Sequence, residues 1–188
     1  MPSPVSIKHS EPHAHAIGWL SYCRAATPNV RAGGSGTVRL DMQNEFQPDV
    51  SLLIEPECGG QTRVSKEGYV EGAPELVVEV ARSSVGIDLH DKLRAYLRNG
   101  VREYIVWRVD DGALDWFVLR EGRYEPLAPA ADGICRSEVF PGLWLDSAAL
   151  LRGDFAAVRK AAEQGLASPE HAQFAARLQE AAAKAAQK

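Results

Sequence analysis

The sequence predicts an α/β domain with a mixed central sheet flanked by helices, added antiparallel hairpins and a C-terminal helical tail. Three patterns support this prediction. Apolar residues recur at helical spacing near the start of the chain, a later β-branched run is typical of a strand buried on both faces, and two turn sequences then mark consecutive hairpins. With 188 residues, 45% of them hydrophobic, the chain can bury one substantial core.

The first half of the chain is predicted to hold a helix, a turn, two strands and a polar loop. These elements span residues 12–26, 33–36, 38–42, 48–54 and 55–72. The helix depends on apolar residues such as Ala16 and Leu20, which lie one helical turn apart. The first strand depends on the alternation of apolar and polar residues, and the loop is rich in glycine.

The second half is predicted to hold a buried strand, a helix, a further strand, two hairpins and a helical tail. The strand, helix and strand span residues 76–80, 88–99 and 102–109. Gly100 ends the helix, and Asp111-Gly112 and Glu121-Gly122 supply the two hairpin turns. Beyond Asp154 the composition shifts to good helix formers, so we expect one domain over 1–153 and a helical tail over 154–188.

Composition limits the protein's partners and compartment. The formal net charge is -4, with Lys+Arg 21 against Asp+Glu 25, so a contact with nucleic acid must be local or shared across an oligomer. Three widely spaced cysteines fit neither a disulfide framework nor a metal site. Residues 1–12 contain no apolar segment of the secretory type, and no run is long enough to span a membrane. We therefore expect a cytoplasmic protein with reduced thiols and no membrane partner.

Glu79 is the chemical anomaly of the sequence, because it lies inside an apolar strand. A buried carboxylate costs several kcal/mol unless it is paired, hydrogen-bonded or bound to a metal. Asp49 begins the preceding apolar strand, and a divalent cation would relieve the repulsion between the two acids. The alternative for two isolated acids is that Asp49 caps a turn and Glu79 pairs with an arginine.

Lys92 favours the metal site over this alternative, because it flanks the apolar stripe of the helix predicted over 88–99 and its ammonium could reach the strand ends. A cation there would lower the pKa of a metal-bound water and balance charge on the reacting phosphate. A lone lysine on a helix is more often a solvated charge.

The segments QPDVSLL, PELVVEVARSS and IDLHDKLRAYLRNGVREYIVW together resemble the PD-(D/E)XK nuclease superfamily, and most closely its Uma-two family of restriction-endonuclease-like proteins. The resemblance covers about residues 2–153. It implies a restriction-endonuclease-like fold in which Asp49 and Glu79 bind Mg²⁺ or Mn²⁺ and Lys92 completes the catalytic set. It also implies cleavage of phosphodiester bonds in nucleic acid, with DNA as the expected substrate.

The chain departs from the family pattern at several positions. The lysine that normally follows the glutamate by two residues is replaced by Ala81, and Lys92 matches the lysine that this family supplies from the next helix. Arg82 stands where relatives have a small residue and could contact a phosphate or remain a solvated loop arginine. His13 matches a family histidine that could approach substrate or a ligand acid, although such a histidine is more often structural. Relatives usually carry a further N-terminal segment, which we expect to be missing here.

Two functions follow from these residues. The first is a metal-dependent endonuclease that uses Asp49, Glu79 and Lys92. The second is a catalytically decayed nuclease fold that acts as a homo-oligomeric nucleic-acid-binding or regulatory module. We also expect a homodimer for two reasons. A net charge of -4 makes an isolated monomer a poor platform for DNA, and the apolar segment LDWFVL is predicted to form an unpaired strand edge that needs cover.

Overall fold

The structure is a computed structural model that describes residues 7–42, 44–82 and 84–187. Residues 1–6, which are half of the segment searched for a secretory signal, lie outside the described residues, as does Ser83 beside Arg82. Within the described part of the chain, no helix is long and apolar enough to cross a membrane.

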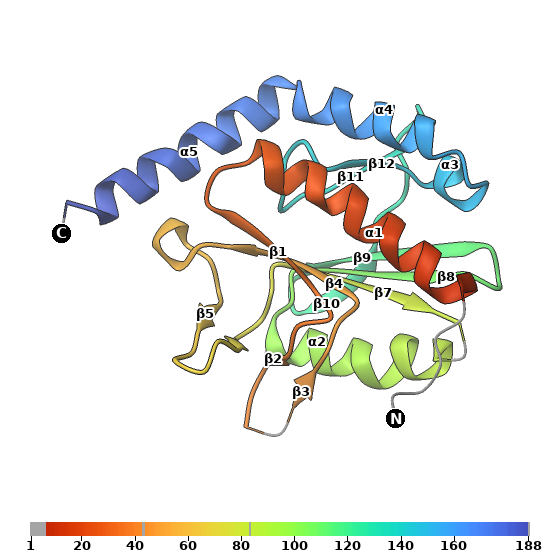
Figure 1. Ribbon diagram of the computed structural model, residues 1–188, viewed down its shortest axis with the longest axis horizontal. Coiled ribbons are helices and arrows are strands. Elements are labelled where there is room, and N and C mark those ends of the chain that lie inside the picture. Colours follow the sequence, from red (N-terminus) through yellow and green to blue (C-terminus); the bar gives the residue numbers. More distant parts are fainter. Residues whose placement is uncertain (1–6, 43, 83, 188) are drawn as a thin grey trace.

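A six-stranded mixed sheet forms the centre of the molecule, with the strand order β1-β4-β7-β8-β9-β10 (Figure 1). The strands are β1 (Val30–Gly34), β4 (Val50–Ile54), β7 (Leu76–Ala81), β8 (Glu103–Arg108), β9 (Ala113–Arg120) and β10 (Arg123–Pro126). Only β7 and β8 pair in parallel within this sheet. The two hairpins that follow β8 extend it antiparallel, as the turn sequences predict.

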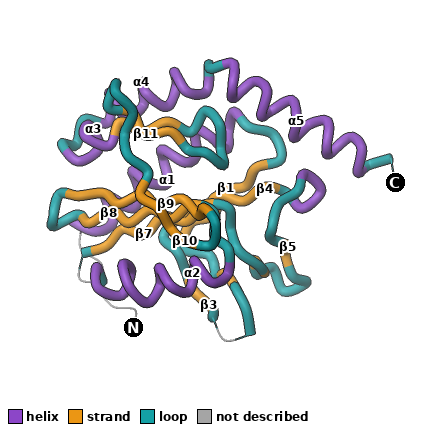
Figure 2. Tube along the Cα trace, turned by 180° about the vertical axis from the view of Figure 1, so that it is seen from behind, coloured by secondary structure: helices purple, strands orange, loops and turns teal. Residues whose placement is uncertain are grey.

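Helices cover both faces of this sheet. One face carries α1 (Ile7–Ala26), α3 (Ser147–Leu151), α4 (Phe155–Leu166) and α5 (Pro169–Ala185), whereas α2 (Leu93–Asn99) lies on the other, as Figures 1 and 2 show from opposite sides. A π-helical turn, η2 (Ile87–Lys92), leads directly into α2. The helix predicted over 12–26 begins earlier in the structure, because α1 starts at Ile7 and Pro12 lies inside it.

Two hydrophobic cores lie on the two faces, because successive side chains of a strand point to opposite sides of a sheet. From β7, Leu76, Val78 and Val80 join α1, α4 and α5 in one core. Val77 and Ala81 join Tyr96 of α2 in the other. Glu79 has the same parity as Val77 and Ala81, so its side chain points toward α2.

Smaller elements complete the fold. They are β2 (Val38–Arg39), β3 (Glu45–Phe46), β5 (Arg63–Val64) and β6 (Val70–Glu71) in a four-stranded sheet, β11 (Ile134–Arg136) and β12 (Trp144–Asp146) in a two-stranded sheet, and the 3-10 turn η1 (Pro56–Cys58). The predicted strand over 38–42 thus shrinks to two residues outside the main sheet. The predicted loop over 55–72 contains three of these short elements.

The predicted turn over 33–36 is wrong in its first half, because Gly33 and Gly34 belong to β1 and pair with Ser51 and Val50 of β4. The sequence of β1, VRAGG, lacks the apolar alternation of a half-buried strand. Its conformation comes from pairing with a strong neighbour, which outweighs its own weak strand preference.

The predicted open edge at LDWFVL is also wrong. This segment lies in β9, between β8 and β10, and Trp116 is only 3% exposed. The true edge is β10, which carries Arg123, Glu125 and Pro126. Charged residues and a proline make this edge a poor template for further strand pairing, so the open-edge argument for a homodimer fails.

Two further buried carboxylates fasten loops to the sheet. Glu75 accepts hydrogen bonds from the backbone N–H groups of Ile54 and Gln61, at 2.8 and 2.7 Å. Glu103 accepts one from the Ser137 hydroxyl at 2.8 Å and others from the N–H groups of Glu138 and Val139. Burial raises the pKa of Glu103 to about 7, although these hydrogen bonds act in the opposite direction.

Candidate active site

Asp49 and Glu79 approach each other where β4 and β7 pair. The antiparallel register aligns Val50 with Val78, so Asp49, one residue earlier, stands opposite Glu79 and on the same face. The Asp49 carboxylate accepts a 2.7 Å hydrogen bond at Oδ2 from the backbone N–H of Val80. This bond fixes Asp49 at the end of the neighbouring strand.

Lys92 reaches Glu79 from the π-helical turn that precedes α2. Its Nζ atom lies 3.0 Å from Oε2 of Glu79 and 2.9 Å from Oδ1 of Asp88. The Tyr96 hydroxyl, one turn further along, donates a 2.9 Å hydrogen bond to the other carboxylate oxygen of Glu79. The helix thus supplies both partners that the buried carboxylate needs.

Burial dominates the electrostatics of Glu79, which is only 3% exposed. Burial raises the pKa of Glu79 to about 7, against the stabilising effects of Lys92 and Tyr96, and repulsion from Asp49 adds to the increase. For Lys92, burial alone would lower the pKa, but the attraction of Glu79 and the hydrogen bond to Asp88 raise it overall. Lys92 therefore carries its charge at neutral pH, and the neighbouring carboxyl group of Glu79 has a pKa of about 7.

The donor atoms match a hard divalent cation in part. Asp49 and Glu79 offer carboxylate oxygens, and Mg²⁺ sites commonly use one or two carboxylates, with water and substrate phosphates as the remaining ligands. Oε2 of Glu79 is within ion-pair distance of Lys92, so a cation would have to compete with this ammonium. No cluster of three or more His, Cys, Asp or Glu side chains able to hold a metal occurs among the described residues.

His13 and Arg82 lie beside this group in different ways. Nε2 of His13, on α1, is 2.8 Å from the backbone oxygen of Asp49, so the imidazole supports the segment that carries a candidate ligand. Arg82 follows β7 and forms an ion pair with Asp110 at 3.0 Å. The structure therefore brings Asp49, Glu79, Lys92 and His13 together, while the ion pair of Arg82 points toward the β8–β9 turn.

The sequence analysis did not single out Asp88 and Tyr96, which the structure places in contact with Lys92 and Glu79, respectively. Each lies four residues from Lys92, on either side of it, and residues four apart are neighbours on a helix. That spacing can be read from the sequence, but by itself it does not distinguish a partner of Lys92 from an ordinary neighbour on the helix. Tyr96 instead counted as a core residue of the helix, which it also is, since it is fully buried.

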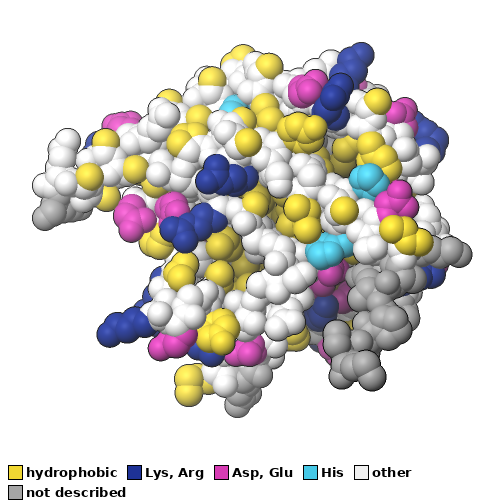
Figure 3. All heavy atoms as spheres, viewed as in Figure 1, with side chains coloured by type: hydrophobic (Ala, Val, Ile, Leu, Met, Phe, Trp, Pro, Cys, Tyr) yellow, Lys and Arg dark blue, Asp and Glu magenta, His cyan; other side chains and the backbone are white. Residues whose placement is uncertain are grey.

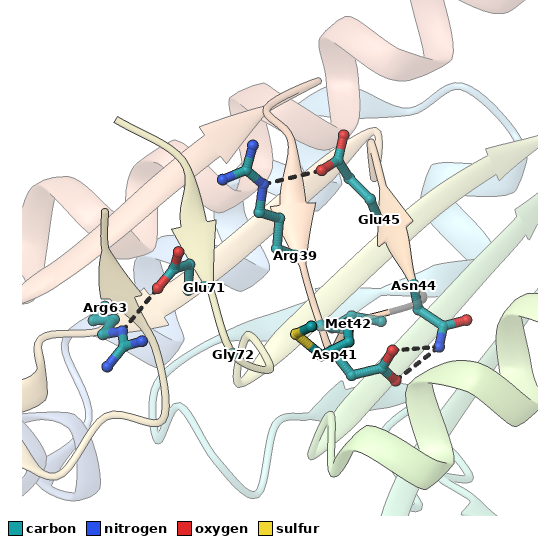
Figure 4. A pocket seen from close by; sticks show the side chains of 9 residues that line it. Arg39, Asp41, Met42, Asn44, Glu45, Arg63, Glu71 and Gly72 are labelled. Carbon is teal, nitrogen blue, oxygen red and sulfur yellow. Dashed lines mark hydrogen bonds and ion pairs between the residues drawn. The ribbon is translucent and has the colours of Figure 1, made fainter. Parts of the chain in front are cut away.

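A cavity of about 570 Å³ lies outside this group of residues, over the four-stranded sheet (Figure 4). Its charged side chains are engaged with one another. Arg39 pairs with Glu45, Arg63 with Glu71, and the Asn44 amide donates to Asp41. Because these contacts satisfy the charged groups, the cavity offers a ligand little free charge.

The face of the molecule drawn in Figure 3 shows no concentration of positive side chains among the described residues. On the face drawn in Figure 3, lysine and arginine side chains are interspersed with acidic ones, and hydrophobic side chains gather in the upper half. This distribution agrees with the net charge of -4. Nucleic acid would have to be held by local contacts.

Comparison with known proteins places the chain among nuclease-like proteins. The sequence model of a family described as “Uma2: Putative restriction endonuclease” matches residues 1–148. No curated protein matches.

Four chains of solved structures match. One is the crystal structure of a putative nuclease belonging to DUF820 from Anabaena variabilis ATCC 29413, with 17% identity and a TM-score of 0.57, covering 80% of this chain and 84% of that chain. At this identity the likeness concerns the fold alone, and it confirms the predicted mixed α/β fold.

Proposed function

The chain belongs to the Uma2 family of putative restriction endonucleases, and from this premise we propose that it is a Mg²⁺- or Mn²⁺-dependent endonuclease that hydrolyses phosphodiester bonds, with DNA as substrate. The observation that carries the proposal is the meeting of Lys92 with Glu79 at 3.0 Å, on the face of β7 where Asp49 also stands. Metal-dependent hydrolysis of a phosphodiester can use an acid pair to hold the metal ion and an ammonium group to stabilise charge on the reacting phosphate.

Each residue has a distinct task in this proposal. Asp49 and Glu79 hold the cation. When bound, Mg²⁺ or Mn²⁺ supplies Lewis-acid polarisation of the phosphate and lowers the pKa of a water. Lys92 orients the attacking water and stabilises the negative charge that develops on the phosphate as the bond to the leaving oxygen breaks.

Arg82 and His13 have supporting tasks. Arg82 would exchange its exposed partner Asp110 for a substrate phosphate, which a planar guanidinium can bind through two hydrogen bonds. The side chain of Arg82 is 28% exposed, and that of Asp110 is 55% exposed, so the exchange costs little. His13 would keep the Asp49 segment in place through its 2.8 Å contact.

The alternative is a decayed nuclease fold that binds nucleic acid or a regulatory partner as a homo-oligomer. One observation favours it, namely that Lys92 already neutralises the better buried of the two acids. The homodimer itself stays a prediction, and light scattering at micromolar concentration tests it. A monomer would remove the homo-oligomeric version of this alternative.

The proposed activity is tested with purified protein and plasmid, linear, single-stranded and RNA substrates, in Mn²⁺ or Mg²⁺ and in chelator. We expect metal-dependent cleavage that Asp49→Asn and Glu79→Gln each abolish. Glu67→Gln is the matched control, since Glu67 is an exposed acid in the polar loop. Cleavage that persists in chelator or in both site variants would contradict the proposal, and binding of nucleic acid without cleavage would favour the alternative.

A further inference from the structure

Asp88 is a buried carboxylate on the π-helical turn, only 1% exposed. Its position is fixed by three contacts. Its backbone N–H donates to the Ser84 carbonyl at 2.9 Å, its backbone oxygen accepts from the Tyr104 hydroxyl at 3.0 Å, and its Oδ2 atom accepts from the Ser84 hydroxyl at 2.5 Å. Asp88 therefore has little freedom to move or to turn its carboxylate.

The remaining carboxylate oxygen of Asp88 faces Lys92. Oδ1 lies 2.9 Å from Nζ, and on its other side the same ammonium lies 3.0 Å from Glu79. Lys92 thus lies between two buried acids from different elements. Of these two, Glu79 is the one on the strand beside Asp49.

We propose that Asp88 is a positioning residue, which holds Lys92 in the site when Glu79 releases it to bind a divalent cation, and which acts only through Lys92. This inference rests on the proposed metal-dependent function. It assigns Asp88 a task different from that of the two strand acids.

The geometry separates positioning from direct ligation. A ligand acid must turn its oxygens toward Asp49 and Glu79, but the carboxylate of Asp88 is held by Ser84 on one oxygen and faces Lys92 with the other. An ammonium that lost Glu79 without a second acid would be a partly buried, uncompensated charge, which is destabilising. Asp88 removes that penalty, so Glu79 becomes available to a cation.

A double-mutant cycle on Mn²⁺ binding tests this proposal without nucleic acid. The dissociation constant is measured by calorimetry for the wild-type chain, Asp88→Asn, Lys92→Met and the double variant. We expect Asp88→Asn to weaken binding roughly tenfold when Lys92 is present and less than about threefold in the Lys92→Met background, because contacting residues are coupled. Asp91→Asn, which removes an exposed acid of the same turn, is the matched control and should change the constant less than about threefold.

Ser84→Ala supplies a second route if Asp88→Asn does not fold. It keeps every charge and removes only the hydrogen bond that orients Asp88. We expect Mn²⁺ binding to weaken about threefold with Lys92 present and to stay unchanged with Lys92→Met.

The outcomes separate this inference from the proposed function. Equal weakening by Asp88→Asn in both backgrounds would overturn it, because Asp88 would then act on the cation directly. Unchanged binding in both backgrounds would overturn it as well. A wild-type chain that binds no Mn²⁺ would instead overturn the metal-dependent function, and the inference with it.

Discussion

The Nζ atom of Lys92 lies 3.0 Å from Oε2 of Glu79, so the ammonium group proposed to act in catalysis is the ion-pair partner of a proposed metal ligand. This relationship explains how an acid can be buried inside β7, since an unpaired carboxylate there would cost several kcal/mol. It also means that binding a metal requires the ion pair to rearrange.

Lys92→Ala should reduce the cleavage rate by about 10²-fold or more, because removal of a contact made in the transition state has effects of that size. Folding should persist, because Lys92 lowers the pKa of Glu79 against the effect of burial, so that without Lys92 the buried carboxyl takes up a proton more readily. Lys92→Arg should not restore the rate, because a planar guanidinium does not replace a compact ammonium. Lys66→Ala, in the exposed loop, is the control. Full activity of Lys92→Ala would assign the catalytic charge to another residue.

Tyr96→Phe should destabilise the protein more at pH 8 than at pH 5 when measured in chelator. Its hydroxyl donates to Glu79, whose pKa of about 7 makes the carboxyl mostly ionised at pH 8 and protonated at pH 5. A hydrogen bond to a charged group contributes about 1.5–3 kcal/mol, against about 0.5–1.5 kcal/mol for a neutral one. Tyr124→Phe is the matched control, because Tyr124 donates to the backbone oxygen of Val101. Denaturant unfolding of both variants should show a pH-dependent loss for Tyr96→Phe alone.

Glu103→Gln should flatten the dependence of stability on pH. Burial raises the pKa of Glu103 from 4.5 to about 7, so the native state holds a proton that the unfolded chain has lost between these values. Stability from this group is complete below pH 4.5 and is lost as the pH rises through 7, by on the order of 3 kcal/mol. We expect the variant to be neutral or stabilising at pH 8 and destabilising at pH 5 in urea unfolding. A parallel loss at both pH values would contradict this assignment.

Arg82→Ala should weaken the binding of DNA and lower the slope of log K against log salt by about one, as the loss of one phosphate contact does. Its effect on stability should stay below about 1 kcal/mol, because the pair with Asp110 is partly exposed. Arg63→Ala is the control, since Arg63 forms a comparable exposed pair with Glu71. An unchanged salt slope for Arg82→Ala would remove Arg82 from the substrate contacts.

The sequence predicts the part of the fold that has its own local signal. The β-branched run of β7, the helix that ends at Gly100 and the hairpins at Gly112 and Gly122 are all found where the pattern places them. β1 is not predicted, because VRAGG becomes a strand only through pairing with β4. The covering of β9 by β10 likewise depends on pairing between strands, which periodicity within one segment does not reveal.

The candidate site follows the same division. Glu79 is identifiable because a carboxylate in an apolar strand demands a partner, and Lys92 because it flanks the inner face of its helix. Asp88 is not identified, because an acid at a predicted helix start has an ordinary explanation there. Its burial and its contacts with Ser84, Lys92 and Tyr104 distinguish it from a solvated helix-start acid.

The separation of the two cores by the sheet has a consequence for how this chain tolerates random mutation. Glu79, Tyr96 and Ala81 share one face, whereas α1, α4 and α5 pack on the opposite face, with His13 as a link to the site. Substitutions at Val158 or Phe174 should lower abundance and thermal tolerance while leaving the turnover of each folded molecule unchanged. A mutational library scored separately for expression and for specific activity would therefore divide along the sheet, and helices α4 and α5 would be the region to optimise for yield.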